Sequence, residues 1–595
     1  MLLDIDIHRG KLLTASVCVV SLYFVKNALK NYLNSKVLNT NRNTKIAYLN
    51  SAKEDFAAYL QQRQIPREDI EMITCLTLQE LVEKLKRQEL PVAYVLLAYQ
   101  HKAFEVDKRL NCVTEFLYPD LSEVNLKGPL AGCPVSIKEC FGMKGRDSCI
   151  GCARNIGKPR GCDAVALKVI RDLGGVPFVI TNVPQTTMST QCSNPINGVT
   201  KNPLKSDRTP HGSSGGEAAL IGAGGSILGL ATDLGGSIRL PSAMCGVVGF
   251  KPTADRLSYR DLAKMATGKP VVPCWGPICR DAASCQFVME LIINSPLSHK
   301  LDPYTPPLLY KQIPNDRRLR IGYFLQFDKL VPVPAVRRAL LETRDRLASR
   351  GHELIEWTPP FKVKAYLELF LKSIFCDGCA FLKTLLANDK VDPCIQGIYG
   401  LSIAPWYRRL WLRAKMRWTG NWEGLVVLNS IRGFTTMEEL EFHIMVLKEF
   451  RNRVVDSLST QSIDVILCPV AGFAVALPIL PPYSTTGMLA FQNLANTLAI
   501  PAGTMPSGCV VDKRDIEVLR EAVEGRVIKE AMDNEEENFY SGYGNLSPLH
   551  RAMLPLQEGT EGLPIPIQFM SLPWQDELCL YAMQELEKAK KAPIA

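Results

Sequence analysis

The chain has 595 residues, 47% of them hydrophobic, so it can bury a large core and is too long for a minimal fold. Its net charge of +9 is mild for this length and does not by itself indicate a nucleic-acid partner. Length alone suggests three or four domains. The motifs described below lie between residues 138 and 237, however, and strand–helix alternation continues on both sides, which favours one large catalytic domain with insertions.

The first predicted element is an apolar helix near the N-terminus, Leu12–Val25 (LLTASVCVVSLYFV), which lies between two lysines. As a helix this run rises about 21 Å, short of the roughly 30 Å hydrocarbon core, and extension to residue 29 makes a membrane span possible. Two aspartates near the start disfavour a cleaved signal peptide, whose first segment is basic. We therefore predict a membrane-anchor helix over residues 1–29, with a buried or peripheral helix as the alternative.

Residues 30–127 are predicted to form a polar, helical lead-in. Thr77 and Glu80 have the spacing of a capping box, in which each side chain accepts a backbone N–H of the other residue. Apolar residues follow at helical spacing, so a helix begins here, and a second helix begins near Pro91.

From residue 128 the pattern alternates between strands and helices. Strand-like runs occur at 134–138, 176–180, 319–324, 353–357 and 463–467, with helical patterns at 165–173 and 334–350. This alternation predicts an α/β fold in residues 128–590, with a large, twisted, mixed β-sheet covered by helices on both faces.

A segment within residues 401–436 differs from this pattern and is predicted to be a membrane-facing helical insertion. Ala404–Trp422 (APWYRRLWLRAKMRWTGNW) mixes four of the chain's seven tryptophans with five arginines and lysines. Aromatic rings at headgroup depth and cations near phosphates suit a membrane interface. The alternative is a surface helix that packs its tryptophans on the body. Nucleic-acid binding is disfavoured, because no recognised module surrounds the segment.

The 19 cysteines show no framework of disulfide bonds. Two CxxC pairs, Cys149/Cys152 and Cys376/Cys379, could together make a four-thiolate zinc site. They lie far apart in unrelated contexts, so we predict no metal, and free, mostly buried thiols in a reducing compartment.

Three stretches carry residues suited to catalysis: GCPVSIKEC around Lys138, TPHGSSGGEAA around Ser213, and DLGGSIRLPSAMCG around Ser237. A serine between glycines lies on tight backbone whose N–H groups can turn toward an oxyanion. A lysine that ends a strand can be buried, which favours the neutral amine that acts as a base. The string GSSGG also matches a nucleophile elbow around Ser214, but the residues before it are a loop and not a strand, so that match is accidental.

Together these stretches, with TNVPQ, CSNP and GFKPT, resemble the amidase-signature family over about residues 128–253. The N-terminal apolar helix, the Trp/Arg segment and LPWQDELCL near the C-terminus resemble its membrane-bound animal branch, the fatty acid amide hydrolases. The resemblance implies the amidase-signature fold, no cofactor, a homodimer, and attachment to the endoplasmic reticulum or another endomembrane with the catalytic domain facing the cytosol.

The resemblance also assigns roles. Ser237 is the nucleophile, Ser213 passes its proton, and Lys138 is the base of a Ser–Ser–Lys triad. The implied substrate contacts are the main chain of Thr187 and the residues that hold the acyl group and oxyanion: Ser213, Leu234, Gly235, Gly236 and Ser237. The family pattern has methionine then phenylalanine where Thr187 and Met188 stand here, so the lining of the acyl channel is altered.

Each candidate also has an ordinary structural interpretation. Ser237 could be a plain turn serine, and Ser213 could cap the helix that opens at Gly215. Lys138 could be an ion-pair partner of Glu139 or Asp233.

The neighbouring residues are predicted to be structural. Ser214 bonds backbone within its own loop, and Asp233 and Arg239 fix the nucleophile loop. His211, where the family pattern has glycine, is a loop side chain and not a base.

The predicted function is a membrane-associated serine hydrolase that converts fatty acid amides, such as acyl ethanolamides and primary fatty amides, to fatty acid and amine. One alternative is an amidase or amidotransferase subunit acting on a polar amide, which the hydrophobic N-terminus and the Trp/Arg segment disfavour. A catalytically inactive membrane scaffold of the same fold is the other.

Overall fold

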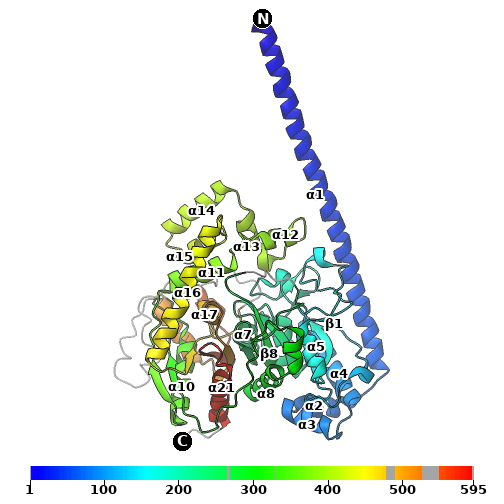
Figure 1. Cartoon of the computed structure of the whole chain (residues 1–595), viewed down its shortest axis with the longest axis vertical. Coiled ribbons are helices and arrows are strands. Elements are labelled where there is room, and N and C mark those ends of the chain that lie inside the picture. The colour runs from blue at the N-terminus through cyan, green and yellow to red at the C-terminus, as the bar shows by residue number, and fades with distance from the viewer. Residues whose placement is uncertain (1, 264–268, 329, 478–488, 525–547, 592–595) are drawn as a thin grey trace.

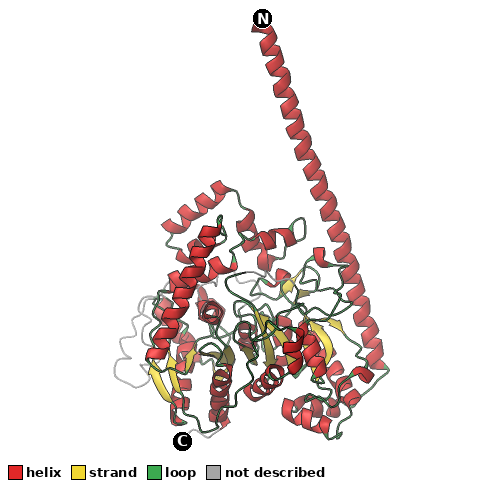
Figure 2. Cartoon of the chain, viewed as in Figure 1, coloured by secondary structure: helices red, strands yellow, loops and turns green. Residues whose placement is uncertain are grey.

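The computed structural model describes residues 2–263, 269–328, 330–477, 489–524 and 548–591. Its centre is an 11-stranded sheet in the order β1-β3-β2-β6-β8-β7-β12-β13-β11-β9-β10. Figure 2 shows strands in yellow among the surrounding helices. The strands are β1 (Val113–Phe116), β2 (Pro134–Lys138), β3 (Val176–Thr181), β6 (Leu228–Asp233), β7 (Val248–Lys251), β8 (Cys274–Cys279), β9 (Arg320–Tyr323), β10 (Glu353–Glu356), β11 (Val465–Cys468), β12 (Ala502–Val510) and β13 (Pro564–Ser571). A separate two-stranded sheet joins β4 (Ser193–Asn194) and β5 (Gly198–Val199).

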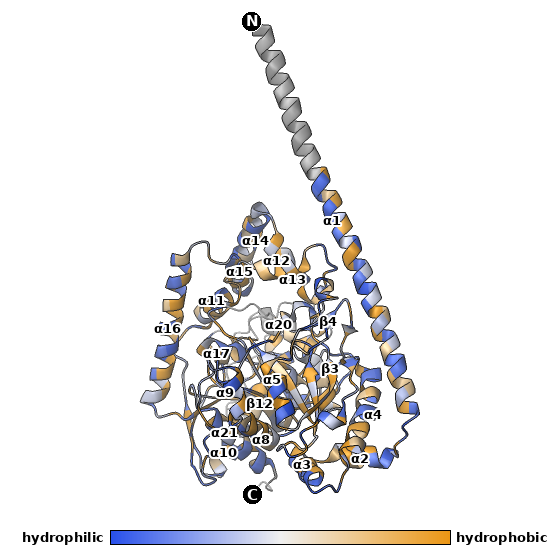
Figure 3. Cartoon of the chain, turned by 45° about the vertical axis from the view of Figure 1, so that its right-hand side comes forward, coloured by the Kyte–Doolittle hydropathy of each residue, from blue (hydrophilic) through white to orange (hydrophobic). Residues whose placement is uncertain are grey.

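The predicted α/β fold with a mixed sheet is confirmed. β2 runs parallel to both β3 and β6, whereas β8 runs antiparallel to β6 and β7. All residues of β2, β3 and β6 are buried, as expected for strands with helices packed over them. The ribbon around β3 and β12 is accordingly coloured largely as hydrophobic (Figure 3).

The chain begins with one helix, α1 (Leu2–Gln61), which extends well beyond the body of the molecule (Figure 1). The predicted anchor over residues 1–29 lies within it, except Met1, which is outside the described residues. Among the helices of the described part of the chain, none combines the length and apolar character of a membrane span. Whether this segment anchors the protein stays a prediction.

The lead-in continues with α2 (Arg67–Cys75), α3 (Leu78–Lys86) and α4 (Val92–Leu110). The capping box of Thr77 and Glu80 at the start of α3 is confirmed. The lead-in also contributes β1, which pairs with β3 of the central sheet. The boundary at residue 127 stays a prediction, but β1 ties the segment before it to the catalytic body.

Six helices lie between β10 and β11 and form the region that includes the predicted insertion: α11 (Val363–Ile374), α12 (Ala380–Leu386), α13 (Pro393–Ile403), α14 (Trp406–Trp418), α15 (Trp422–Ser430) and α16 (Met437–Thr460). No residue of α14 is buried. The side chains of Trp406, Trp411 and Trp418 are 72%, 59% and 89% exposed, so these three do not pack on the body as the alternative interpretation required. The fourth tryptophan, Trp422 at the start of α15, is half-buried and packs against the core. Figure 1 places α14 at the end of the molecule toward which α1 projects.

Candidate active site

The last residue of β2, Lys138, lies at the centre of the candidate site. Its side chain is fully buried, and its Nζ contacts four oxygens: Ser213 Oγ at 2.9 Å, Ser214 Oγ at 2.8 Å, Thr232 Oγ1 at 2.8 Å and Thr232 O at 3.3 Å. Three of the four are hydroxyls, which can donate or accept a hydrogen bond. A neutral amine, with two N–H groups and one lone pair, can therefore be satisfied here.

No carboxylate lies within ion-pair distance of Lys138 in the residues that the structure describes. Of the two candidate partners, Glu139 accepts the N–H of Cys149 with Oε1, and Asp233 pairs with Arg239. The ion-pair interpretation of Lys138 is therefore wrong. Burial lowers the pKa of the Lys138 amine, more than nearby Cys140 and Asp233 raise it. The site thus favours the uncharged amine that a general base must be.

Ser213 and Ser214 follow a tight loop and immediately precede α6 (Gly215–Gly222). The prediction that Ser214 bonds only within its own loop is wrong, because its Oγ lies 2.8 Å from Lys138 Nζ and donates to Thr232 O on β6 at 3.4 Å. The Ser214 N–H donates to the carbonyl of Ser237 at 3.2 Å, so the two serine loops lie against each other. Capping is not the role of Ser213, since the N-cap position of α6 is Ser214, whose side chain makes no cap bond.

Ser237 lies in the turn that joins β6 to α7 (Arg239–Met244), and its side chain is half-buried. Asp233, at the end of β6, accepts the N–H of Gly236 at 2.7 Å and the N–H of Ile238 at 3.1 Å. These two bonds fix the turn on both sides of Ser237. A hydrogen bond between the hydroxyls of Ser213 and Ser237 stays a prediction.

The hydrogen bonds of this turn reduce the number of backbone N–H groups that are available to an oxyanion. Because the N–H of Gly236 already donates to Asp233, it is not available to an oxyanion in this conformation. The remaining candidate donors are the N–H groups of Leu234, Gly235 and Ser237. Gly236 has φ +103°, a conformation that glycine adopts without strain.

Thr187 lies in a short 3-10 turn, Gln185–Thr187, beside the catalytic loop. A Cβ on Gly212 would lie 2.9 Å from Ser189 O and 3.4 Å from Pro184 Cγ, so this segment packs directly on the residue before Ser213. Thr186 and Thr187 both have positive φ, 67° and 59°, which is uncommon for β-branched residues. Sequence reasoning found Thr187 only through the family resemblance and missed this backbone strain.

His211 is buried in the loop that leads to Ser213. Its Nε2 accepts the N–H of Leu477 at 3.1 Å, and its ring stacks on Phe473 with centroids 5.4 Å apart. Burial lowers its pKa to about 3, so the ring is neutral at physiological pH. This arrangement supports a positioning role and disfavours a role as base.

Comparison with known proteins agrees with this geometry. The model of the amidase family matches residues 94–580. The chain belongs to the amidase family. Fatty-acid amide hydrolase 1 of Sus scrofa is 37% identical over 542 residues, covering 90% of this chain and 89% of that protein. Fatty acid amide hydrolase 1 of Caenorhabditis elegans is 30% identical over 533 residues, covering 87% of this chain and 88% of that protein.

Solved structures show the same fold. A structure of fatty acid amide hydrolase superposes with a TM-score of 0.73 at 23% identity and covers 93% of this chain and 95% of that chain. A structure of 6-aminohexanoate cyclic dimer hydrolase gives a TM-score of 0.63 at 18% identity, covering 87% and 97%. The amidase-signature fold predicted from the glycine- and serine-rich stretch is thus confirmed, and the chain is an amide hydrolase.

The amidase site contains a buried carboxyl group that sequence reasoning missed. Glu217 on α6 accepts from Ser136 Oγ of β2 and from Thr181 Oγ1 of β3, the latter at 2.7 Å. Burial raises its pKa to about 7, against these hydrogen bonds and the nearby Lys138. Its signal in the sequence is its place in GSSGGE, three residues after Ser214.

The described residues of the amidase hold no group of three or more His, Cys, Asp or Glu side chains arranged for a metal ion. Cys149, Cys152 and Cys379 are buried and Cys376 is half-buried, and burial raises the pKa of each thiol. All four are free thiols.

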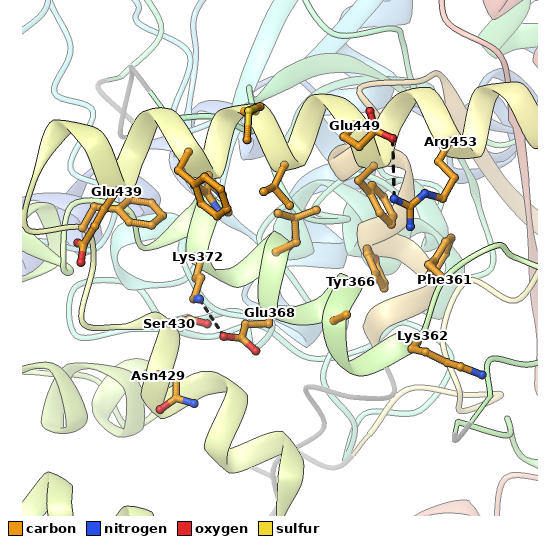
Figure 4. Close-up of a pocket in the computed structure, with 18 of the residues that line it drawn as sticks. Phe361, Lys362, Tyr366, Glu368, Lys372, Asn429, Ser430, Glu439, Glu449 and Arg453 are labelled. Atoms are coloured by element: carbon orange, nitrogen blue, oxygen red, sulfur yellow. Dashed lines mark ion pairs between the residues drawn. The ribbon is translucent and has the colours of Figure 1, made fainter.

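A groove of about 1430 Å³ lies between α11 and α16, bordered by α15 (Figure 4). Its lining includes Phe361, Tyr366 and Phe450, with ion pairs between Lys372 and Glu368 and between Arg453 and Glu449 at its edges. None of the three predicted catalytic residues lines it. Leu369 of α11 lines the groove, whereas the next residue, Phe370, lies against Gly235 of the nucleophile loop. The helix α11 therefore lies between the groove and this loop.

Proposed function

We propose that this amidase is a membrane-associated serine hydrolase that cleaves fatty acyl amides through Ser237, Ser213 and Lys138. The observation that carries the proposal is the environment of Lys138, a fully buried amine with four neutral oxygen partners, one of them Ser213 Oγ at 2.9 Å. An amine held in this way is suited to start a reaction cycle uncharged.

In the first step, Ser237 Oγ attacks the amide carbonyl carbon. The Ser237 proton passes to Ser213 Oγ as the Ser213 proton passes to Lys138 Nζ, which becomes an ammonium. The carbonyl oxygen becomes an oxyanion, held by the candidate N–H donors of Leu234, Gly235 and Ser237. Each such donor typically stabilises the transition state by about 3 to 4 kcal/mol.

In the second step, the C–N bond breaks. The leaving nitrogen takes a proton from Ser213, which recovers one from Lys138, so the amine departs neutral and Ser237 carries the acyl group as an ester. Proton delivery to the nitrogen matters because, without it, the group would have to leave as a nitrogen anion, which is a very poor leaving group. Water then attacks the ester carbonyl carbon, and its proton passes through Ser213 to Lys138. When the C–O bond to Ser237 breaks, the proton returns from Lys138 through Ser213 to Ser237 Oγ, which releases the fatty acid and restores the neutral triad.

A lipid substrate is supported by two observations. The relatives in Sus scrofa and Caenorhabditis elegans are fatty acid amide hydrolases that align along most of this chain. The exposed tryptophans of α14 alternate with cations, including Lys415, whose Nζ lies 5.3 Å from the Trp411 ring centroid. Such a helix can lie in a membrane interface, where fatty amides partition.

The remaining parts of the proposal concern assembly and location. We propose a homodimer from the family resemblance, and exposed apolar side chains on α16, among them Met437, Phe442 and Met445, favour it. The free thiols and the membrane features favour an endomembrane such as the endoplasmic reticulum, with the catalytic domain in the reducing cytosol.

The test is covalent labelling. The full-length protein is exposed to a fluorophosphonate and to a long-chain fatty amide, and intact-mass and peptide mass spectrometry locate the adduct. We expect both adducts on Ser237 and none in Ser237→Ala, whose fold is checked by circular dichroism. Labelling that persists in Ser237→Ala would assign the nucleophile to another residue, and absence of labelling in the wild type would favour an inactive scaffold.

A further inference from the structure

The side chain of Gln492 lies directly against the nucleophile loop. It belongs to α17 (Ala490–Leu498), and a Cβ on Gly236 would lie 2.3, 2.5 and 2.7 Å from its Cδ, Oε1 and Nε2. All three carboxamide atoms are at similar distances, so the carboxamide covers the Cα of Gly236, the residue immediately before Ser237. The neighbouring Gly235 instead faces Phe370 of α11, whose Cζ would lie 3.0 Å from a Cβ there.

The position of this carboxamide is fixed by the backbone beneath it. The Gln492 carbonyl accepts Arg239 Nη1 at 2.6 Å, and Asn496, one turn later, accepts Arg239 Nη2 at 2.6 Å and donates to Asp233 Oδ1 at 2.9 Å. The helix that carries Gln492 is therefore bound to the same ion pair that shapes the turn around Ser237. The two elements cannot shift independently without breaking buried hydrogen bonds.

The carboxamide oxygen of Gln492 lacks a partner. The residue is only 2% exposed, and in the described part of the chain its Oε1 is a buried acceptor with no hydrogen-bond donor. Buried acceptors are nearly always satisfied, and leaving one unsatisfied is unfavourable. An unsatisfied acceptor that lies against the residue before Ser237 is available to a donor that a bound substrate brings.

The chemistry of the reaction identifies that donor. An acceptor oxygen repels the carbonyl oxygen and the oxyanion, so Gln492 Oε1 cannot serve the oxyanion site. The scissile amide, however, carries an N–H on the atom next to the carbonyl carbon. That N–H becomes a stronger donor as the nitrogen is protonated before it leaves. An ester of the same acyl chain has an oxygen with lone pairs at this position and has no donor to offer.

We propose that Gln492 is a specificity-determining residue that accepts the N–H of the leaving nitrogen and so favours amides over esters. The inference rests on the proposed function, in which Ser237 is the nucleophile. It adds a contact to the leaving group that neither the triad nor the oxyanion donors provide.

The test compares a long-chain primary amide with the methyl ester of the same acid. In Gln492→Met, which keeps the length of the side chain, we expect kcat/KM for the amide to fall about tenfold, the effect of one hydrogen bond. We expect kcat/KM for the ester to stay within about twofold. Gln492→Ala also removes the carboxamide and adds no bulk, so it should lower kcat/KM for the amide while leaving kcat/KM for the ester nearly unchanged. Agreement between the two variants would show that the effect of Gln492→Met does not come from a folding defect.

Two controls separate the possible failures. Gln286→Met on α8 (Ala282–Ile293) removes another unpartnered buried glutamine oxygen and should leave both substrates unaffected. The rate of fluorophosphonate labelling reports the nucleophile alone, since that reagent has no N–H, and it should be unchanged in both Gln492 variants. Equal losses for amide and ester, or no loss for the amide, would overturn the role of Gln492. A wild-type protein that cleaves neither substrate and takes no label would overturn the proposed function instead.

Discussion

Asp233 and Arg239 form a fully buried, two-point ion pair at the base of the nucleophile turn, with Nε–Oδ2 at 3.0 Å and Nη2–Oδ1 at 3.1 Å. Arg239 also bonds Gln568 Oε1 on β13 at 2.6 Å. The pair therefore links the turn around Ser237 to α17 and the far half of the sheet. Its function is to fix the turn, and neither residue lies in the proposed path of the proton.

Removing one charge of this pair should be costly. In Asp233→Asn the guanidinium of Arg239 stays buried without its counter-ion, a change that typically costs about 3 to 5 kcal/mol of folding free energy. Urea unfolding followed by tryptophan fluorescence measures this loss. Asp207→Asn, which removes an exposed carboxylate 4.0 Å from Arg208, should change stability by no more than about 0.5 kcal/mol. Equal stability of the two variants would contradict the role assigned to the pair.

The contribution of the Asp233–Arg239 pair to folding stability should fall only at acidic pH. Burial alone would raise the pKa of Asp233, but Arg239, with smaller contributions from Lys251 and Asn496, holds it well below the usual value of 3.8. The stabilisation by the ionised carboxylate is therefore present above about pH 4 and is lost only as pH falls toward the lower folded pKa. Loss of activity between pH 5 and 8 should accordingly not arise from Asp233.

Replacement of Lys138 should change both the rate and its pH profile. The active form of the amine is neutral, so kcat/KM of the wild type should rise with pH, and the lowered pKa places that rise below 10.5. In Lys138→Ala we expect a loss of about 10²- to 10⁴-fold near neutral pH and a steeper dependence, since hydroxide must replace the base. Discontinuous activity assays between pH 5 and pH 10 measure both the loss in kcat/KM and its pH dependence.

The matched control is Lys251→Met on β7. Lys251 is also fully buried, and its Nζ donates to the carbonyls of Pro252 and Ile500 at 2.8 and 2.7 Å. This variant should lower stability but keep the shape of the pH profile. A pH profile for Lys138→Ala that matches the wild type would remove lysine as the base.

Ser213 and Ser214 both contact Lys138, yet their loss should differ. Ser213→Ala removes the hydroxyl proposed to carry the proton between Ser237 and Lys138, so we expect a loss of about 10²- to 10⁴-fold in turnover. Ser214→Ala leaves Lys138 bonded to Thr232 and Ser213, so we expect about a tenfold loss, the effect of one hydrogen bond. Single-turnover kinetics with a fatty amide measure both, and a larger loss in Ser214→Ala would exchange the two roles.

The exposed face of α14 should govern attachment to lipid and not chemistry. In the double variant Trp411→Ser and Trp418→Ser we expect weaker binding to anionic liposomes in a sedimentation assay. Turnover of a short, soluble amide should be unchanged, because neither side chain is buried. Tyr304→Ser, which removes a 97% exposed aromatic ring outside α14, should bind liposomes like the wild type. Equal losses in binding and in turnover would indicate a packing role for α14.

The sequence by itself determined the family, the mixed α/β sheet and the three stretches that carry Lys138, Ser213 and Ser237. These features are local, because strand–helix alternation and glycine-rich turns can be read within a few residues of one another. The exposure of α14 could be predicted in the same way, from cations placed between its aromatic residues.

Only the tertiary structure decided which neighbours each of these residues has. Three features depend on where separate strands and turns meet. Lys138 has no carboxylate partner among the residues that the structure describes, Gly236 gives its N–H to Asp233, and Ser214 contacts the lysine. The position of Gln492 depends on α17, more than 250 residues further along the chain, packing on the turn through Arg239. Contacts at such separations depend on packing and leave no periodic pattern, so the sequence could not predict them.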